Sequence, residues 1–76
     1  MSEQAILDAI SAFFRDRGKE IPTANADILE SGIVDSMELL ELAAHIESAL
    51  SMDIPQERMT ADNFRSIQSI VRTLTR

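Results

Sequence analysis

The residues best placed to do chemistry lie at one junction, Gly32-Ile33-Val34-Asp35-Ser36-Met37. The pattern that follows predicts a helix beginning here, with Ser36 in its first turn and its hydroxyl in solvent. A helix N-terminus offers free N–H groups and a partial positive charge, which favour a phosphate-bearing group on the serine oxygen. Asp35 is placed to cap the helix, or to help a modifying enzyme hold a metal. Since Asp-Ser is also an ordinary helix start, spacing alone leaves capping as the simpler interpretation.

Other kinds of site find little support in the sequence. The chain has no cysteine and a single histidine, His45, which falls on a polar helix face and is expected to be solvated. His45 lies about two and a half helical turns beyond Ser36, too far to act as its base, and no Gly-x-Ser-x-Gly elbow is present. Gly18 and Gly32 are isolated, and nothing selects a catalytic carboxylate pair or a set of metal ligands. We therefore expect neither an enzyme nor a metal site.

The spacing of apolar residues predicts the elements that position this junction. We expect an all-α fold: a small antiparallel four-helix bundle with three main helices, one short third helix and a long first loop. The predicted helices cover residues 3–17, 36–51, 61–64 and 67–75. Their expected caps are Ser2, Asp35 (with Glu38 completing a capping box), Thr60 and Ser66. The connection over 18–35 is long for so small a domain, and such loops are often functional.

Two sets of apolar residues are expected to reach the core. The second helix carries a broad stripe formed by Leu39, Leu42, Ala43, Ile46, Ala49 and Leu50. The long connection is expected to be pinned by Ile21, Ile28, Leu29, Ile33 and Val34.

Length and composition limit the possible functions. With 76 residues, the chain is expected to form a single domain over 1–76 with a small core. Its 13 acidic and 7 basic residues give a formal net charge of −6, which disfavours nucleic acid and anionic membrane surfaces as partners. Phe13, Phe14 and Phe64 are expected in the core rather than as stacking platforms. Without a signal peptide or an apolar run near the roughly 18 residues of a membrane span, we expect a cytoplasmic protein that does not insert into membranes.

The acidic residues are concentrated in one span. No lysine or arginine lies between Glu20 and Glu57, and the span that these two residues bound holds nine of the 13 acidic residues. Such a run is commonly a solvated face. The alternative is a recognition surface for basic partners, because a field of one sign speeds association.

The residues around Ser36 also resemble a known family. The run Asp35-Ser36-Met37-Glu38-Leu39-Leu40-Glu41-Leu42, with Gly32 before it and Ile46-Glu47 and Asp53-Ile54-Pro55 after it, is similar to acyl carrier proteins and peptidyl carrier domains. The resemblance covers nearly the whole chain. Asp-Ser alone is a weak motif, and it gains specificity from the chain length, the order of the helices and the acidic second helix. Met37 stands where the family usually has leucine, a change that keeps the size and polarity of the side chain.

The resemblance implies a function and its partners. Ser36, next to Asp35, would receive 4′-phosphopantetheine from coenzyme A through a phosphodiester, added by a phosphopantetheinyl transferase. The thiol of this cofactor would carry an acyl or aminoacyl group as a thioester, so the chain needs no cysteine of its own. Loading ligases and downstream transferases or synthases with basic docking surfaces would be the partners, and a monomer is expected. The candidate partner contacts are the apolar Met37 and Leu40 and the acidic Glu38, Glu41 and Glu47.

Several alternatives stay open from the sequence. Leu40 fits ordinary core packing as well as partner contact, and Glu47 fits a solvated or internally paired carboxylate. The Gly-Ile-Val-Asp-Ser lead-in looks more like discrete carriers of aminoacyl, D-alanyl or specialised-metabolite pathways, with fatty-acid synthesis as the nearest alternative. An alternative function of a different class is an unmodified helical module that binds a partner through its acidic face.

Overall fold

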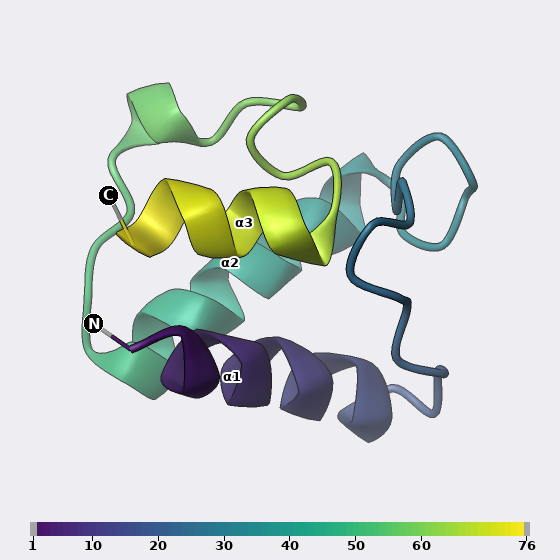
Figure 1. Ribbon diagram of the computed structural model, residues 1–76, viewed down its shortest axis with the longest axis horizontal. Helices are drawn as coiled ribbons and strands as arrows, with labels where there is room; N and C mark the ends of the chain where they lie inside the picture. The colour runs from purple at the N-terminus through teal and green to yellow at the C-terminus, as the bar shows by residue number, and fades with distance from the viewer. Residues whose placement is uncertain (1, 76) are drawn as a thin grey trace.

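Three α-helices and one 3₁₀ helix make up the fold. The computed structural model describes residues 2–75, which contain α1 (Glu3–Asp16), α2 (Ser36–Leu50), η1 (Gln56–Arg58) and α3 (Ile67–Thr75), and no strand. Helices α2 and α3 both run back against the direction of α1, and the long first connection lies at one end of the molecule (Figure 1). The all-helical prediction is confirmed for this part of the chain. No helix within it is long and apolar enough to cross a bilayer.

The caps predicted at the starts of α1 and α3 are present. The Ser2 hydroxyl accepts a hydrogen bond from the Ala5 N–H at 3.2 Å. The Ser66 hydroxyl accepts one from the Ser69 N–H at 3.1 Å, and the Ser69 hydroxyl accepts one from the Ser66 N–H at 2.9 Å. Each cap satisfies N–H groups that have no partner inside the helix, so both helices begin where the sequence indicates.

The end of α1 turns the chain back toward α2. Gly18 has a φ of +70°, a left-handed conformation that glycine adopts without a Cβ clash. The N–H groups of Gly18 and Lys19 donate to the carbonyls of Arg15 and Phe14 at 3.0 and 2.9 Å. This is the Schellman arrangement that commonly closes a helix, and it fixes the position of Lys19 relative to α1.

The predicted short helix over 61–64 is wrong. These residues form a single turn, in which the Phe64 N–H donates to the Thr60 carbonyl at 3.1 Å and the Asn63 N–H donates to the Thr60 hydroxyl at 3.1 Å. Thr60 therefore caps as expected. The turn does not grow into a helix because the next cap, at Ser66, follows at once and starts α3. The short helical element lies earlier in the chain, as η1.

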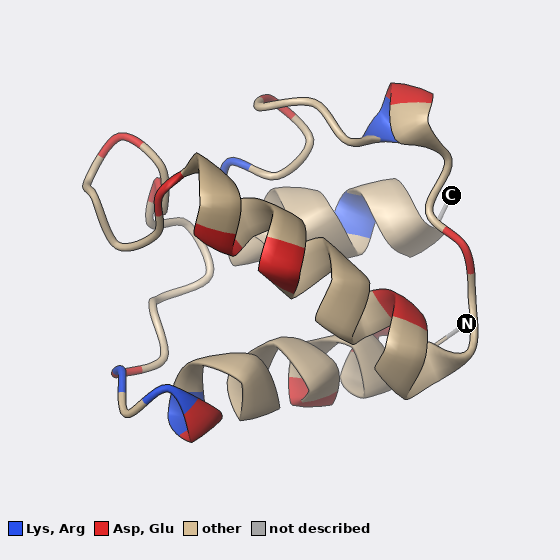
Figure 2. Cartoon of the chain, turned by 180° about the vertical axis from the view of Figure 1, so that it is seen from behind, with Lys and Arg blue, Asp and Glu red and all other residues tan. Residues whose placement is uncertain are grey.

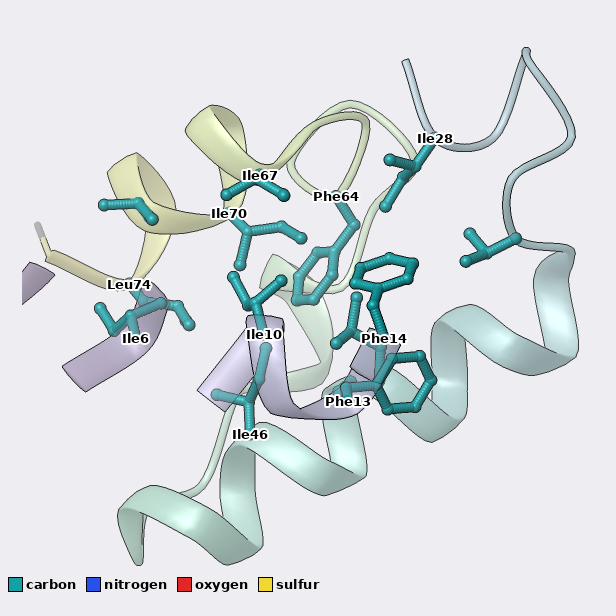
Figure 3. Packing of buried hydrophobic residues seen from close by; sticks show 14 of the residues in the cluster. Ile6, Ile10, Phe13, Phe14, Ile28, Ile46, Phe64, Ile67, Ile70 and Leu74 are labelled. Atoms are coloured by element: carbon teal, nitrogen blue, oxygen red, sulfur yellow. The ribbon is translucent and has the colours of Figure 1, made fainter. Parts of the chain in front are cut away.

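The core lies between α1 and the two other helices. Helix α1 packs against both α2 and α3. Figure 3 shows Ile10 and Phe14 of α1 meeting Phe64, which precedes α3. The largest fully buried side chains come from every α-helix and from the connections: Phe14, Phe64, Ile6, Ile10, Ile28, Leu42, Ile46, Ile70 and Val34.

The long first connection is held on this core by two of its predicted apolar anchors. Ile28 is fully buried and Val34 is nearly so. The Ile28 N–H donates to the Arg65 carbonyl at 2.8 Å, and the Ala24 carbonyl accepts from the Gln68 N–H at 3.0 Å. The connection is therefore joined to the start of α3 by its backbone, which gives the beginning of α2 a fixed support.

Two predicted core residues lie at the surface. Ile21 is 47% exposed, and Ala49 is exposed on α2. The stripe of α2 is narrower than its apolar residues suggest, because only Leu42, Ala43 and Ile46 are buried. The prediction counted apolar residues on the helix surface, whereas burial depends on how much of that surface α1 covers.

His45 packs at the edge of this narrow stripe, and the prediction that it is solvated is wrong. Its ring centroid lies 5.8 Å from that of Phe13 on α1. Its Nε2 atom is buried and has no hydrogen-bond partner among residues 2–75. His45 comes next to the fully buried Ile46 in the sequence. The large Phe13 ring on α1 reaches past the apolar residues of α2 and also contacts His45.

Candidate functional site

Ser36 is the first residue of α2, and it is exposed. Asp35 is the N-cap: its carboxylate accepts from the Glu38 N–H at 2.7 Å, while the Glu38 carboxylate accepts from the Asp35 N–H at 3.3 Å. This confirms the predicted capping box. The N–H groups of Ser36 and Met37 come too early in the helix to have an intrahelical acceptor, and they lie at its positive end. A phosphate on the Ser36 oxygen fits these surroundings.

The backbone approaches this helix start through a tight turn. The Asp27 carboxylate accepts hydrogen bonds from the N–H groups of Leu29 and Glu30 at 3.1 and 2.8 Å. Gly32 has a φ of +77°, which lets the chain reverse without a Cβ clash. The next apolar anchor, Val34, is 1% exposed and ties the turn to the core immediately before the cap.

Two large apolar side chains beside Ser36 face solvent. Met37 is 67% exposed and Leu40 is 57% exposed. The alternative of core packing for Leu40, which the sequence leaves open, does not describe the structure. Large apolar side chains that cluster at the surface often mark a site where another molecule binds. The pair beside the exposed serine is therefore suited to binding a partner.

Cations from the end of α1 pair with the first two acidic residues of α2. Lys19 Nζ lies 2.7 Å from Glu38 Oε2, and Arg17 Nη2 lies 3.2 Å from Glu41 Oε1. The hydrogen bond from Lys19 holds the pKa of the Glu38 carboxyl below its ordinary value of 4.5, with a further contribution from the Asp35 N–H. The Arg17–Glu41 pair is more exposed, with 36% and 47% of the two side chains accessible.

Glu47, the third acidic residue singled out on α2, has an internal hydrogen bond. Its carboxylate accepts from the Ile54 N–H at 2.8 Å, which ties the segment after α2 back onto the helix. Internal pairing is one of the alternatives that the sequence leaves open for Glu47. Partner binding by Glu38, Glu41 and Glu47 stays a prediction, and each of these carboxylates also has a structural contact.

The acidic span therefore has basic neighbours in space. Figure 2 shows acidic residues along α2 and basic residues at the end of α1. Arg17 and Lys19 come immediately before the base-free span in the sequence. The acidic run alone does not indicate that these two cations pair with Glu41 and Glu38. Lys19 is the residue near the site that sequence reasoning missed. Its partners are 14 and 19 residues away, and no local pattern links them.

The structure brings together Asp35, Ser36 and Glu38 at one helix start, with Met37 and Leu40 exposed beside it. His45 does not join this group, since it packs on α1. No cluster of three or more His, Cys, Asp or Glu side chains suited to a metal occurs among residues 2–75.

Comparison with known proteins agrees with this geometry. Neither a curated protein nor a solved structure matches the chain significantly. The family model described as "Phosphopantetheine attachment site" matches residues 4–74, which is almost the whole chain. The chain belongs to this family, the phosphopantetheine attachment domains of carrier proteins, and its cofactor is covalently attached 4′-phosphopantetheine.

Proposed function

We propose that Ser36 is the attachment residue and that the protein is a carrier rather than an enzyme. The single observation that supports this best is the exposed serine at the first position of a capped helix. There the N–H groups and the helix dipole offset the charge of a phosphodiester. Asp35 and Glu38 hold each other in the capping box, which leaves the Ser36 hydroxyl free to react.

The other exposed serines offer poorer surroundings. The Ser2 hydroxyl caps α1, and the Ser31 hydroxyl donates to the Asp27 carbonyl. Ser48 lies in the last part of α2, and Ser51 follows its end, where the helix dipole disfavours an added negative charge. Ser36 thus combines exposure with a helix N-terminus better than the other exposed serines within 2–75 do.

The attached cofactor would supply a thiol on a long arm, to which an acyl or aminoacyl group is bound as a thioester. The protein's own residues would present this arm to a phosphopantetheinyl transferase, a loading ligase and a downstream transferase or synthase. Tethering raises the effective concentration of the bound group at each partner. Met37 and Leu40 would provide apolar contact, while Glu41 and the other acidic residues of α2 would steer basic surfaces.

The cargo is proposed to be an aminoacyl or specialised-metabolite group, on the resemblance of the Gly32–Ser36 lead-in to carriers of those pathways. Fatty-acid synthesis is the nearest alternative. The two are separated by isolating the protein from its native cell and determining by mass spectrometry what the thiol carries. An aminoacyl or specialised acyl group supports the proposal, and a series of straight-chain fatty acyl groups contradicts it.

The attachment itself is tested by intact-mass measurement. The purified chain is incubated with coenzyme A and a phosphopantetheinyl transferase of broad specificity. We expect one phosphopantetheine per chain for the wild type, none for Ser36→Ala, and one for the control Ser48→Ala, which removes an exposed serine from the same helix. Modification of Ser36→Ala would move the site elsewhere. An unmodified wild type would instead favour the acidic interaction module.

A further inference from the structure

We infer that Lys19 positions Ser36 for modification, an inference that rests on Ser36 being the attachment residue. Lys19 is the only lysine in the chain. It belongs to neither α1 nor α2, and it comes 17 residues before the serine. Its ammonium group nevertheless joins the two backbone segments that flank Ser36.

The contacts of the ammonium group lie on both sides of the serine. Lys19 Nζ donates to the Ile33 carbonyl at 2.7 Å and to Glu38 Oε2 at 2.7 Å. Ile33 precedes Ser36 by three residues and Glu38 follows it by two. The other carboxylate oxygen of Glu38 accepts from the Asp35 N–H. One cation therefore connects the last residues of the loop, the capping box and the first turn of α2.

Lys19 is itself held by the core. Its N–H donates to the carbonyl of Phe14 at 2.9 Å, within the turn that ends α1, and Phe14 is fully buried. The side chain thus reaches from a rigid backbone position to the start of α2. A continuous series of hydrogen bonds runs from the Phe14 backbone through Lys19 and Glu38 to the cap beside Ser36.

The carboxylate of this pair is less exposed than the carboxylate of the neighbouring ion pair. The Lys19 and Glu38 side chains are 34% and 23% exposed, compared with 36% and 47% for the neighbouring Arg17–Glu41 pair. Exposed pairs contribute little because water screens them. The Lys19–Glu38 pair is also charge-assisted on both sides and short, which fixes its geometry more firmly than a single long contact.

For modification, the consequence of this link is the orientation of the serine. The loop before α2 turns at Gly32, a residue with broad backbone freedom. After this turn, Val34 is buried and donates its N–H to the Ile28 carbonyl at 2.9 Å, and Ile33 is partly buried against the core. Lys19 adds the link from this segment to the Glu38 carboxylate. Without the ammonium group, the Ile33 carbonyl and the Glu38 carboxylate are no longer tied together. Ser36 would then sample more orientations in the transferase, and misplacement of a reacting atom lowers the rate of the chemical step.

Steady-state kinetics of phosphopantetheine transfer test this role. For Lys19→Met we expect kcat to fall about tenfold with KM nearly unchanged, because the docking residues stay in place. Lys19→Arg should restore most of the rate, since a guanidinium can bridge the same two acceptors.

The matched control is Arg58→Met. It removes another cation that ties a connection to a helix end, through a 3.2 Å bond to the Thr73 carbonyl. Its η1 segment lies at the opposite end of the molecule from the start of α2 (Figure 1).

The possible results are distinct. A wild-type kcat for Lys19→Met, a change in KM alone, or equal losses for Lys19→Met and Arg58→Met would each overturn the inference. Failure of the wild type itself to accept phosphopantetheine would contradict the proposed function instead. Amide hydrogen exchange gives a second readout, in which Lys19→Met should speed exchange at the hydrogen-bonded N–H groups of Asp35, Glu38 and Leu39 and leave α1 and α3 protected.

A chemical variant covers the case in which Lys19→Met does not fold. Acetylation of the folded wild type converts the single lysine ammonium to a neutral amide, and the same treatment of Lys19→Arg modifies only the chain's N-terminal amine. We expect transfer to slow in the acetylated wild type but not in the treated Lys19→Arg protein. Equal rates in the two treated proteins would overturn the inference.

Discussion

Glu38 has more structural contacts than an acidic residue that only attracts partners would need. It completes the capping box with Asp35 and pairs with Lys19 at 2.7 Å. The sequence indicates the first contact, because the Asp-x-x-Glu spacing is local. It gives no sign of the second, because that contact depends on how α1 ends. Reversing Glu38 to lysine would therefore disturb the helix start as well as the surface charge, whereas Glu41 offers a cleaner test of charge.

The pH dependence of stability should report the Lys19–Glu38 pair. Because folding lowers the pKa of Glu38 below its ordinary value of 4.5, the pair stabilises the folded state above that pH. This contribution is lost as the pH falls through the lowered pKa. Urea unfolding should show Glu38→Gln to be less stable than the wild type at pH 7, since glutamine keeps the capping oxygen but not the charge.

The same comparison at acid pH provides the control. Below the lowered pKa of Glu38, wild type and Glu38→Gln should have nearly the same free energy of unfolding, because both then carry a neutral side chain. Glu57→Gln, which changes an exposed glutamate in η1, should differ little from the wild type at either pH. A deficit of Glu38→Gln that persists unchanged in acid would show that the charge is not its cause.

Helix α1 packs against both other α-helices. Its contact with α2 includes a buried polar atom without a hydrogen-bond partner among residues 2–75. His45 places a buried Nε2 atom without a hydrogen-bond partner against Phe13. An unpaired buried polar group costs about 1–3 kcal/mol. The contact between the two rings returns about 0.5–1.5 kcal/mol. The centre of the first range, about 2 kcal/mol, exceeds the centre of the second, about 1 kcal/mol, so the histidine is expected to weaken the α1–α2 contact.

His45→Leu should therefore raise the free energy of unfolding by about 1 kcal/mol, because leucine fills the site without a polar atom. Denaturant unfolding at neutral pH measures this change. His45→Gln is the matched control: it keeps a polar group at the same position and should bring no gain. If leucine and glutamine gave equal stability, the buried nitrogen would not be the source of the weakness.

The elements show where sequence patterns suffice. Periodicity and caps located α1, α2 and α3 to within one residue at each end, because these signals are local. The pattern at Thr60 predicts the cap correctly and the helix after it wrongly, because the cap at Ser66 leaves room for only one turn. The environments of Ile21, Ala49 and His45 were mispredicted because they depend on how far α1 covers its neighbours.

At the scale of the whole molecule, the net charge of −6 is distributed unevenly but is less concentrated than the sequence suggests. Arg17 and Lys19 offset two carboxylates of α2, and Arg65 lies within 3.6 Å of an Asp27 oxygen and 2.6 Å of an Asp62 oxygen. The field that a partner meets near Ser36 is thus a moderate negative one around an apolar patch. Such a surface suits brief contacts, in which charge sets the rate of encounter and apolar contact sets the fit.

This balance predicts a measurable salt dependence of modification. Raising the ionic strength from about 0.01 M to about 0.1 M shortens the screening length from about 30 Å to about 10 Å. For the wild type, kcat/KM of phosphopantetheine transfer should fall several-fold over this range. Glu41→Gln should flatten the dependence, because Glu41 is exposed on α2 beside Leu40. Asp8→Asn, which changes an exposed acidic residue of α1, is the control and should show the same salt dependence as the wild type.

A rate that does not change with salt would show that the apolar pair, Met37 and Leu40, alone directs docking. The acidic residues of α2 would then be structural in this protein.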